Sequence, residues 1–520
     1  SILRRRWRGS YDTAMSVIFV GALDDYFVKV AEELIKRGVA VSCFLDRFDN
    51  PAKKKPVFKN VQDIDARQFM YPEHIFALNQ HTGEVLSEET LRVFEHAESV
   101  FLSITDRFSI SLSVIVRKML FRELLLHFYH FIRKGGYTHI IFPNAPHGGW
   151  NSVLYFVAKH FGLRTLVLEY TRINDRMVVW EDYESVKKVP VDFLQGEDQA
   201  TIVARIDEEL YREAFRESEW LKDSNRVNVA TLQPRGLVSY ALAYAQEAVR
   251  VLGSDWRLAA GQPTYAGRAP MFLNEPQHPL VTATRAFLAR RQYQRLRRFY
   301  DHLARPAPAE APYVLYFLNY QPEKTTTPLG GVFDDQILAV RTLAEALPSG
   351  WHVYVKEHPR QFSGVLDSAP FRSEAFYRRL AALPQVQLLP VDSDALALID
   401  GAVCTATVTG SVGWQGMLAG KPCILFGVSW YSPCRSCYNV KSLTDVKAAL
   451  ADIAHTTPVQ VKEDLLKYLA FAQHDLLLGS NNETFARRSR RSLNELAVGL
   501  AKGLFARLAP QPLYEKQYTA

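Results

Sequence analysis

The chain has 520 residues, of which 48% are hydrophobic and 22% charged, and its formal net charge is +7. This balance excludes a largely disordered chain, and the length predicts two large domains rather than one. The five scattered cysteines exclude a disulfide framework, so we expect a reducing, cytoplasmic compartment.

The first half alternates between short apolar runs and helix-length segments, which predicts a parallel sheet covered by helices. Its first run, Met15–Leu23, is too short for a signal peptide and is expected to form a strand. The longer run Ser111–Ile132 is interrupted by charges and predicts a buried helix, so no membrane-spanning helix is expected. A helix is expected at 26–37. The expected strands are 16–20, 39–45, 99–104, 139–142 and 163–168.

Residues that follow the carboxyl ends of parallel strands are candidates for ligand contacts. Asn144 and His147 follow the strand expected at 139–142, and both are suited to bind the hydroxyl groups of an acceptor sugar. Trp150 is suited to stack on a sugar ring. A turn that caps the start of a helix remains the alternative.

The middle of the chain, 200–301, has a helical pattern and few strand signals. Four prolines within 305–312 predict a linker. The alternation then resumes, with strands expected at 313–318, 351–355, 386–389, 402–405 and 422–426 and helices at 335–347 and 414–419. We therefore expect an N-terminal domain (1–304), the linker, a C-terminal domain (313–475) and a helical tail (476–520).

The tail contains a basic amphipathic pattern at 484–508. Such a helix either docks on the first domain or lies on an anionic membrane surface, and docking is the interpretation we favour. Further basic clusters lie at 4–8 and 290–298. They are not interleaved with aromatic residues, so nucleic acid is not an expected partner.

A long loop rich in glycine and threonine follows the first strand of the second domain. Long loops within compact domains are uncommon and are often functional. We expect Gln321, Glu323, Gly330 and Gly331 to contact a sugar or a phosphate, with Glu323 orienting a hydroxyl group. A simple connecting loop is the alternative.

The apolar strand at 351–355 runs directly into Lys356, Glu357, His358 and Pro359. A cation and an imidazole at the end of a strand are placed to bind an anion, and a nucleotide phosphate fits this position. The alternative is a structural turn.

A second candidate anion site is the loop that contains Thr409, Gly410 and Ser411, which precedes the helix expected at 414–419. Hydroxyl groups and backbone N–H groups at the start of a helix favour negative charge. The alternative is that Ser411 only caps the helix.

Together these motifs resemble the donor domain of bacterial capsule and lipopolysaccharide glycosyltransferases, in particular the capsule-type 3-deoxy-manno-octulosonic acid (Kdo) transferases. The resemblance covers 313–426 and implies a GT-B fold, in which two Rossmann-like α/β domains face each other across a donor-binding crevice. It implies that His358 and Ser411 bind the phosphate of a CMP-linked sugar, with Lys356 beside them. It also implies catalysis without a metal or a resident cofactor.

The same families carry an acidic Glu-Asp-Gly segment after a strand of the first domain. The comparable position here has Glu169, but Tyr170 and Thr171 replace the other two residues. The catalytic carboxylate is therefore either Glu169 or Asp175, with Glu169 favoured because it ends a buried strand. Alternatively, Glu169 only pairs with a nearby arginine such as Arg172, which we otherwise assign to acceptor binding. Asp24, Asp25 and Asp106 are the reserve candidates.

The sequence therefore predicts an enzyme that transfers a sugar, best matched by Kdo from CMP-Kdo, to a capsule, O-antigen or glycolipid acceptor. The expected partners are the nucleotide sugar, a lipid-linked or polysaccharide acceptor and, peripherally, the cytoplasmic face of the inner membrane. Two alternatives remain open: a CDP-alcohol phosphotransferase of the teichoic-acid type and a non-catalytic adaptor. Cys434 and Cys437 form a CxxC pair without the further ligands that a zinc site needs.

Overall fold

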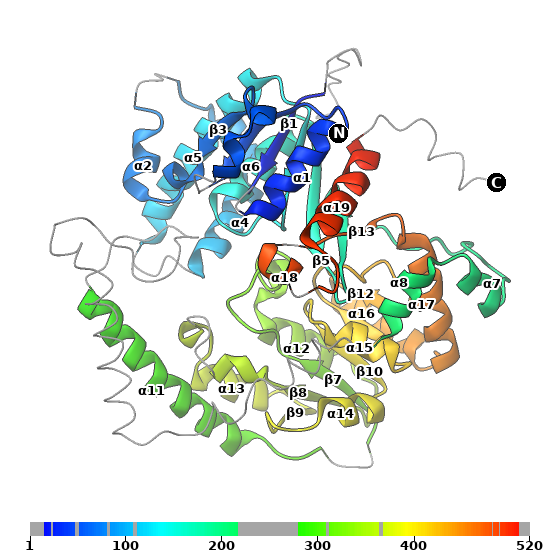
Figure 1. The fold of residues 1–520 in the computed structure, drawn as a ribbon. Coiled ribbons are helices and arrows are strands. Elements are labelled where there is room, and N and C mark those ends of the chain that lie inside the picture. The colour runs from blue at the N-terminus through cyan, green and yellow to red at the C-terminus, as the bar shows by residue number, and fades with distance from the viewer. Residues whose placement is uncertain are drawn as a thin grey trace.

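The computed structural model contains two α/β domains, one above the other in Figure 1. Each domain is built around one predominantly parallel sheet. The structure describes residues 15–508 apart from 22–23, 47–50, 81–83, 108–111, 217–278, 308–310, 363–367, 481 and 488. Most of the helical segment expected at 200–301 lies outside the described residues.

The first domain contains a seven-stranded sheet in the order β13-β6-β5-β4-β1-β2-β3. The strands from β5 to β3 are parallel, whereas β6 and β13 add antiparallel at one edge. The strands are β1 (Val17–Val20), β2 (Val41–Asp46), β3 (Gln62–Asp65), β4 (His139–Phe142), β5 (Arg164–Tyr170), β6 (Arg176–Trp180) and β13 (Leu476–Leu478).

Alternating residues of the buried strands pack against helices on both faces of this sheet. Ile18 and Val20 belong to the core that is shared with α4, α5 and α6, whereas Val17 and Phe19 belong to the core shared with α1 and α19. This alternation follows from the two-residue period of a strand. The helices are α1 (Asp25–Lys36), α2 (Pro72–Ala77), α3 (Glu88–Val93), α4 (Glu95–Asp106), α5 (Val114–Gly135), α6 (Trp150–His160) and α19 (Leu493–Leu508).

The second domain contains a six-stranded, fully parallel sheet in the order β12-β11-β10-β7-β8-β9. Its strands are β7 (Tyr313–Phe317), β8 (His352–Lys356), β9 (Val386–Leu389), β10 (Cys404–Thr407), β11 (Cys423–Leu425) and β12 (Cys437–Asn439). Its helices are α11 (Pro279–Leu303), α12 (Gln336–Ala344), α13 (Glu374–Ala381), α14 (Ala395–Gly401), α15 (Val412–Leu418), α16 (Leu443–Ile453) and α17 (Pro458–Ala472).

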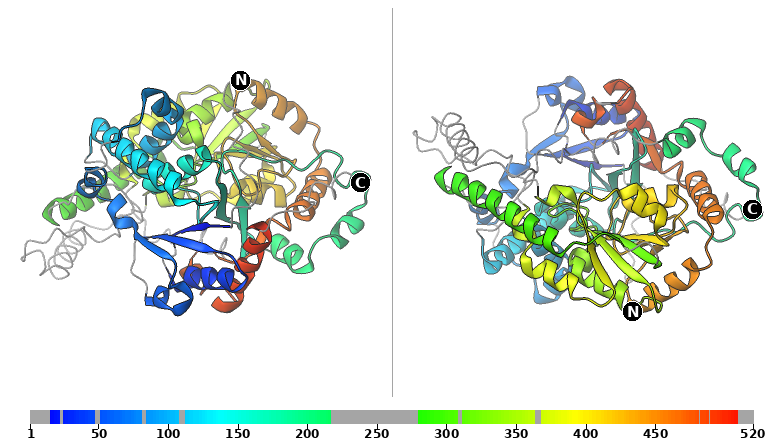
Figure 2. Two further views of the ribbon diagram at one scale, coloured as in Figure 1. Left: turned by 90° about the horizontal axis from the view of Figure 1, so that it is seen from above. Right: turned by 90° about the horizontal axis from the view of Figure 1, so that it is seen from below.

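The carboxyl ends of β5 in the first sheet and of β7, β8 and β10 in the second sheet lie around one pocket. Beside it, a shared hydrophobic cluster joins Ile173 and Val178 of the first domain to Trp414 and Leu425 of the second. The short helices α7 (Gln199–Ala204) and α8 (Glu208–Phe215) pack into the same cluster, and Figure 2 shows them beside α17. Two Rossmann-like domains that face each other in this way form a GT-B fold, which confirms the predicted fold class.

The strand predicted at 99–104 is wrong, because these residues lie within helix α4. Its buried residues Ala97, Phe101, Ile104 and Thr105 recur every three or four positions, which is the period of a helix. Asp106 therefore ends a helix rather than following a strand. The first sheet also contains β3 and β6, which the sequence patterns did not predict.

Helix α11 lies in the segment that the sequence assigned to the first domain, but it packs on the second. Its residues Leu296 and Tyr300 are buried in the core of the second sheet, and the Tyr300 hydroxyl donates to the Leu389 carbonyl at 2.6 Å. The expected boundary at 304–305 therefore separates α11 from the sheet on which it packs.

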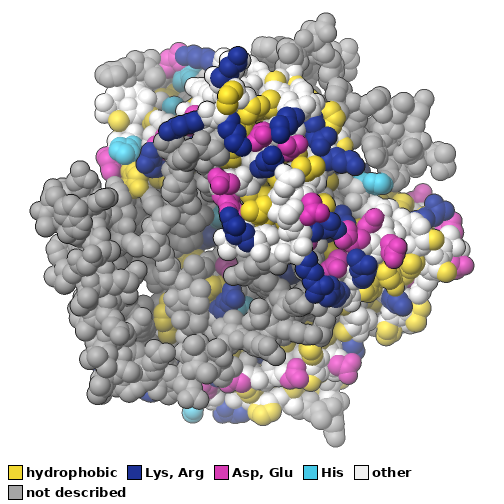
Figure 3. Space-filling model, viewed as in Figure 1, with side chains coloured by type: hydrophobic (Ala, Val, Ile, Leu, Met, Phe, Trp, Pro, Cys, Tyr) yellow, Lys and Arg dark blue, Asp and Glu magenta, His cyan; other side chains and the backbone are white. Residues whose placement is uncertain are grey.

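The C-terminal segment packs against the first domain through β13, α18 (Glu483–Ala486) and α19. Leu496, Leu500 and Leu504 of α19 are buried against α1. Figure 3 shows Lys and Arg side chains interspersed with Asp and Glu on this face of the molecule. In the C-terminal segment, Arg487 forms an ion pair with Glu483. Among the helices of the described residues, none is long and apolar enough to cross a membrane.

Candidate functional site

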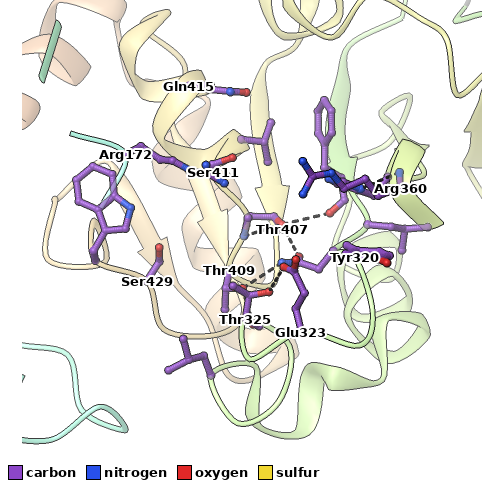
Figure 4. A pocket seen from close by; sticks show the side chains of 18 of the residues that line it. Arg172, Tyr320, Glu323, Thr325, Arg360, Thr407, Thr409, Ser411, Gln415 and Ser429 are labelled. Carbon is purple, nitrogen blue, oxygen red and sulfur yellow. Dashed lines mark hydrogen bonds between the residues drawn. The ribbon is translucent and has the colours of Figure 1, made fainter. Parts of the chain in front are cut away.

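A pocket of about 230 Å³ lies at the meeting point of the two domains. Its wall combines the end of β5 with the ends of β7, β8 and β10 and the start of α15. Figure 4 shows Arg172 of the first domain in this pocket together with Tyr320, Glu323, Arg360 and Ser411 of the second. The pocket therefore lies where ligands bind in open α/β sheets, beyond the carboxyl ends of the strands.

His358 is a neutral hydrogen-bond donor in this pocket. Burial, together with the nearby charges of Arg360, Lys356 and Arg172, lowers the pKa of its imidazole to about 3. The backbone N–H of Arg360 donates to Nδ1 at 3.2 Å, so the neutral ring carries its proton on Nε2. The Tyr320 ring stacks on the imidazole with the ring centroids 5.5 Å apart, which fixes its orientation.

The two residues before His358 support the strand end rather than offering free charges to a ligand. The Lys356 ammonium donates to the Val391 carbonyl at 2.6 Å, and burial lowers its pKa to about 8. The Glu357 carboxylate is fully buried and accepts from Arg372 at 2.7 Å and from the backbone N–H of His358 at 2.7 Å. Both residues, like Pro359, nevertheless line the wall of the pocket.

Ser411 also lines the pocket, and its side chain makes no capping hydrogen bond at the start of α15. The structure therefore argues against the alternative that Ser411 only caps this helix. Thr409 and Gly410 lie beside it on the wall. The Thr409 hydroxyl accepts from the Asn319 amide at 3.0 Å and donates to the Thr325 carbonyl, so it joins this loop to the loop after β7.

Of the four residues expected to bind a ligand in the loop after β7, Glu323 lines the pocket. The other three, Gln321, Gly330 and Gly331, do not line it. Burial raises the pKa of Glu323, although Arg172 and Arg360 oppose this effect. Gln321 is hydrogen-bonded within its own domain, to Asp334, Gln336 and Arg372. Gly330 is required by close packing, because a Cβ atom would lie 2.4 Å from the Thr326 carbonyl oxygen. Gly331 has a φ of 55° in the same turn.

Glu169 lies at the end of β5, with 6% of its side chain exposed, and lines the first-domain side of the pocket. Its Oε1 accepts from the Lys324 ammonium at 2.5 Å, and Lys324 comes from the second domain. Its Oε2 is buried and has no hydrogen-bond partner among the described residues. A buried carboxylate oxygen without a partner is costly unless a ligand or a reaction uses it.

Asp175 lies away from the pocket. It adopts a positive φ of 54°, and its carboxylate accepts from the Ser489 hydroxyl at 2.7 Å, next to α19. The loop that would have brought Asp175 back to Glu169 instead turns toward the C-terminal segment. The other carboxylates considered from the sequence also have structural contacts, since Asp24 caps α1 and Asp106 pairs with Arg117. Asp25 lies in the first turn of α1.

Of the residues expected to bind an acceptor, only Arg172 lines the pocket. Asn144 lies next to it, because its amide oxygen accepts from Lys324 at 3.1 Å. His147 donates through Nδ1 to the Ala145 carbonyl at 2.8 Å. Trp150 is 6% exposed and packs against Phe69, which makes it a core residue.

The site also contains four residues that the sequence patterns did not predict, namely Lys324, Arg360, Tyr320 and Asn319. Arg360 directly follows His358 and Pro359, and this adjacency is a signal that sequence inspection offers. The other three lie in the long loop that was singled out, but their roles depend on contacts with distant segments.

The described residues contain no group of three or more His, Cys, Asp or Glu side chains that would hold a metal ion. All five cysteines, including Cys434 and Cys437, are buried and unpaired by disulfides.

Residues 269–449 match a family model described as "Capsule polysaccharide biosynthesis protein". This segment includes α11, His358 and Ser411. A comparison with curated protein sequences found no match.

Similar solved structures include two KpsC domains from Thermosulfurimonas dismutans, described as beta Kdo 2,7 and beta Kdo 2,4 transferases, each 15% identical. The first match covers 38% of this chain and 66% of that chain, with a TM-score of 0.21. The second covers 64% and 88%, with a TM-score of 0.25. A spinosyn rhamnosyltransferase, SpnG, is 10% identical over 88% of this chain and 96% of that chain, with a TM-score of 0.22.

The depressed pKa of His358 has a consequence for stability. In the unfolded chain a histidine titrates near 6.5, so between about pH 6.5 and pH 3 the unfolded state binds more protons and stability falls as the pH falls. We expect His358→Gln to remove this loss, so that the drop in unfolding free energy from pH 7 to pH 4.5 is smaller than in the wild type by about 2 kcal/mol. Urea denaturation at both pH values measures it. His302→Gln, at an exposed position on α11, is the control, and equal drops in all three proteins would contradict the assignment.

Proposed function

We propose that this protein is a glycosyltransferase that moves a sugar from a nucleotide donor to a bacterial surface polysaccharide or glycolipid. The observation that carries the proposal is the arrangement of the pocket. One cavity is lined by His358, Arg172, Arg360, Ser411 and Glu169. The imidazole of His358 carries its proton on Nε2, and Oε2 of Glu169 has no partner among the described residues.

In this proposal the donor phosphate binds between the two arginines and accepts hydrogen bonds from His358 and Ser411. These groups stabilise the negative charge that develops on the phosphate oxygen as the bond from the sugar carbon to that oxygen breaks and its electron pair leaves with the nucleotide. Because His358 is neutral near pH 7, it contributes a hydrogen bond rather than a proton.

Glu169 then acts on the sugar side of the breaking bond. As a general base, it takes the proton of the acceptor hydroxyl while the hydroxyl oxygen attacks the sugar carbon. As a nucleophile, it first bonds to that carbon and is displaced by the acceptor oxygen in a second step. Asp175 is not proposed for either role, because it lies away from the pocket.

The donor that fits the resemblance best is CMP-Kdo, and the acceptor is a capsule or O-antigen polysaccharide or its lipid-linked precursor. The match of 269–449 to the capsule polysaccharide biosynthesis model supports this substrate class. Cationic side chains meet the phosphate charge, so the proposal includes no metal and no resident cofactor. We also propose that the protein works at the cytoplasmic face of the membrane that carries the acceptor.

A phosphotransferase that relies on a pair of histidines is less well supported. Among the described residues that line the pocket, His358 is the one histidine, and His147 is hydrogen-bonded to a backbone carbonyl outside the lining.

The identity of the nucleotide can be tested by thermal shift. We expect CMP to raise the melting temperature, since a ligand that binds only the native state stabilises it, and CDP, UDP and GDP to raise it less. The CMP shift should persist in excess EDTA and should be lost in Arg360→Ala. A shift with UDP or GDP but none with CMP would replace the Kdo-type donor by a hexose donor, and a CMP shift that requires magnesium would contradict metal-free binding.

The catalytic carboxylate can be tested by a matched pair of amide substitutions. Glu169→Gln keeps the size of the side chain and removes its charge, so turnover should fall by about a thousandfold or more while CMP binding stays close to that of the wild type. Asp175→Asn changes a carboxylate outside the pocket and should leave turnover within about threefold of the wild type. A severe loss in Asp175→Asn with a mild one in Glu169→Gln would reverse the assignment.

A further inference from the structure

The loop after β7 reaches from the second domain into the first through the side chain of Lys324. Its ammonium donates to Glu169 Oε1 at 2.5 Å and to the Asn144 amide oxygen at 3.1 Å, and it lies 5.6 Å from the centre of the Tyr170 ring. Glu169 lies at the end of β5 and Asn144 follows β4, and these two strands are neighbours in the first sheet. One side chain of the second domain thus contacts two strand ends of the first.

This contact is shielded from solvent. The exposed fractions of the Lys324 and Glu169 side chains are 15% and 6%. Removing one partner of such an ion pair leaves the other charge buried and uncompensated, so the pair strongly favours this geometry. Because Lys324 binds Oε1, the carboxylate oxygen without a partner among the described residues is Oε2.

The loop that carries Lys324 is also attached to the proposed phosphate site. The Thr325 carbonyl accepts from the Thr409 hydroxyl, two residues before Ser411. The Thr327 carbonyl accepts from Arg107, at the end of α4 in the first domain. Glu323, directly before Lys324, lines the pocket. The position of Lys324 therefore depends on the same loop contacts that form the phosphate side of the pocket.

We propose that Lys324 is a positioning residue for the transfer reaction, which orients Glu169 so that Oε2 is the reacting oxygen and couples this orientation to the loop at the phosphate site. The inference rests on the proposed function and assigns Lys324 no contact with the donor. Asn144 is the second hydrogen-bond acceptor of the Lys324 ammonium and so helps to hold the ammonium between the two strand ends.

The test is a kinetic comparison of Lys324→Met with the wild type. Methionine keeps a side chain of similar length but removes the ammonium, so kcat should fall about a hundredfold, the scale expected when a catalytic group is misplaced by about an ångström. The KM for the nucleotide sugar and the CMP-induced thermal shift should stay within about threefold and within a degree or two of the wild-type values. Lys324→Arg, which keeps a cation that can bind a carboxylate, should recover part of kcat.

A double-variant cycle separates this role from a general structural one. If Lys324 acts through Glu169, adding Lys324→Met to Glu169→Gln should cause no further loss of kcat, and the two losses of melting temperature should be less than additive. The matched control is Lys467→Met, which removes a similarly buried lysine whose ion pair with Glu463, at 2.7 Å, lies within one helix. We expect it to leave kcat unchanged.

The outcomes are distinguishable. Wild-type kcat in Lys324→Met, or the same fold-loss in the Glu169→Gln background, overturns the positioning role. Additive losses of melting temperature overturn it without any assay of activity, because they show that the two side chains do not act as a pair. A wild-type protein that transfers no sugar from any nucleotide donor counts instead against the proposed glycosyltransferase.

Discussion

The geometry of this site depends on one buried ion pair across the domain interface, between Lys324 and Glu169. The strand ends of both sheets surround a single pocket, and in this arrangement both charges are shielded from solvent. Removing either side chain would leave the other charge buried and uncompensated. In addition to the ion pair, a buried hydrophobic cluster joins Ile173 and Val178 of the first domain to Trp414 and Leu425 of the second and holds the two domains together.

Within this arrangement the two sides of the pocket have different chemistry. The second domain provides a neutral imidazole donor, a hydroxyl and the Arg360 guanidinium. The first provides the Arg172 guanidinium and the Glu169 carboxylate, of which one oxygen is paired with Lys324 and the other has no partner among the described residues. Glu357, which the sequence placed among the ligand contacts, lines the pocket and is the buried acceptor of the backbone N–H of His358. The fixed orientation of His358 thus originates in its own domain, and the orientation of Glu169 originates in the opposite one.

Much of the fold was predictable, because buried parallel strands correspond in the sequence to short apolar runs that are followed by polar residues. This pattern predicted most strands of both sheets. It also indicated the polar residues at or after the strand ends, and four of these line the pocket, namely His358, Ser411, Glu323 and Glu169. Predictions from this pattern are wrong where a short apolar run fits a helix as well as a strand. Residues 99–104 are as apolar as a strand, and only the spacing of their buried positions over a longer segment reveals a helix.

The rest was not predictable because it depends on contacts between distant segments. No local sequence pattern predicts that α11 packs on the second sheet or that β13 pairs with β6. Lys324 is an ordinary loop lysine in the sequence, and its role appears only when Glu169, 155 positions earlier, lies 2.5 Å away. Asp175 was the second candidate for the catalytic carboxylate, but it accepts a hydrogen bond from the Ser489 hydroxyl instead.

The central claim, that the pocket between the two sheets is the nucleotide site, is tested most directly by hydrogen exchange with and without CMP, since a bound ligand slows the local opening of the backbone that it contacts. We expect slower exchange in peptides that cover 319–331, 356–362 and 407–415, with little change in α19. Slower exchange elsewhere, with these three segments unchanged at saturating CMP, would contradict it.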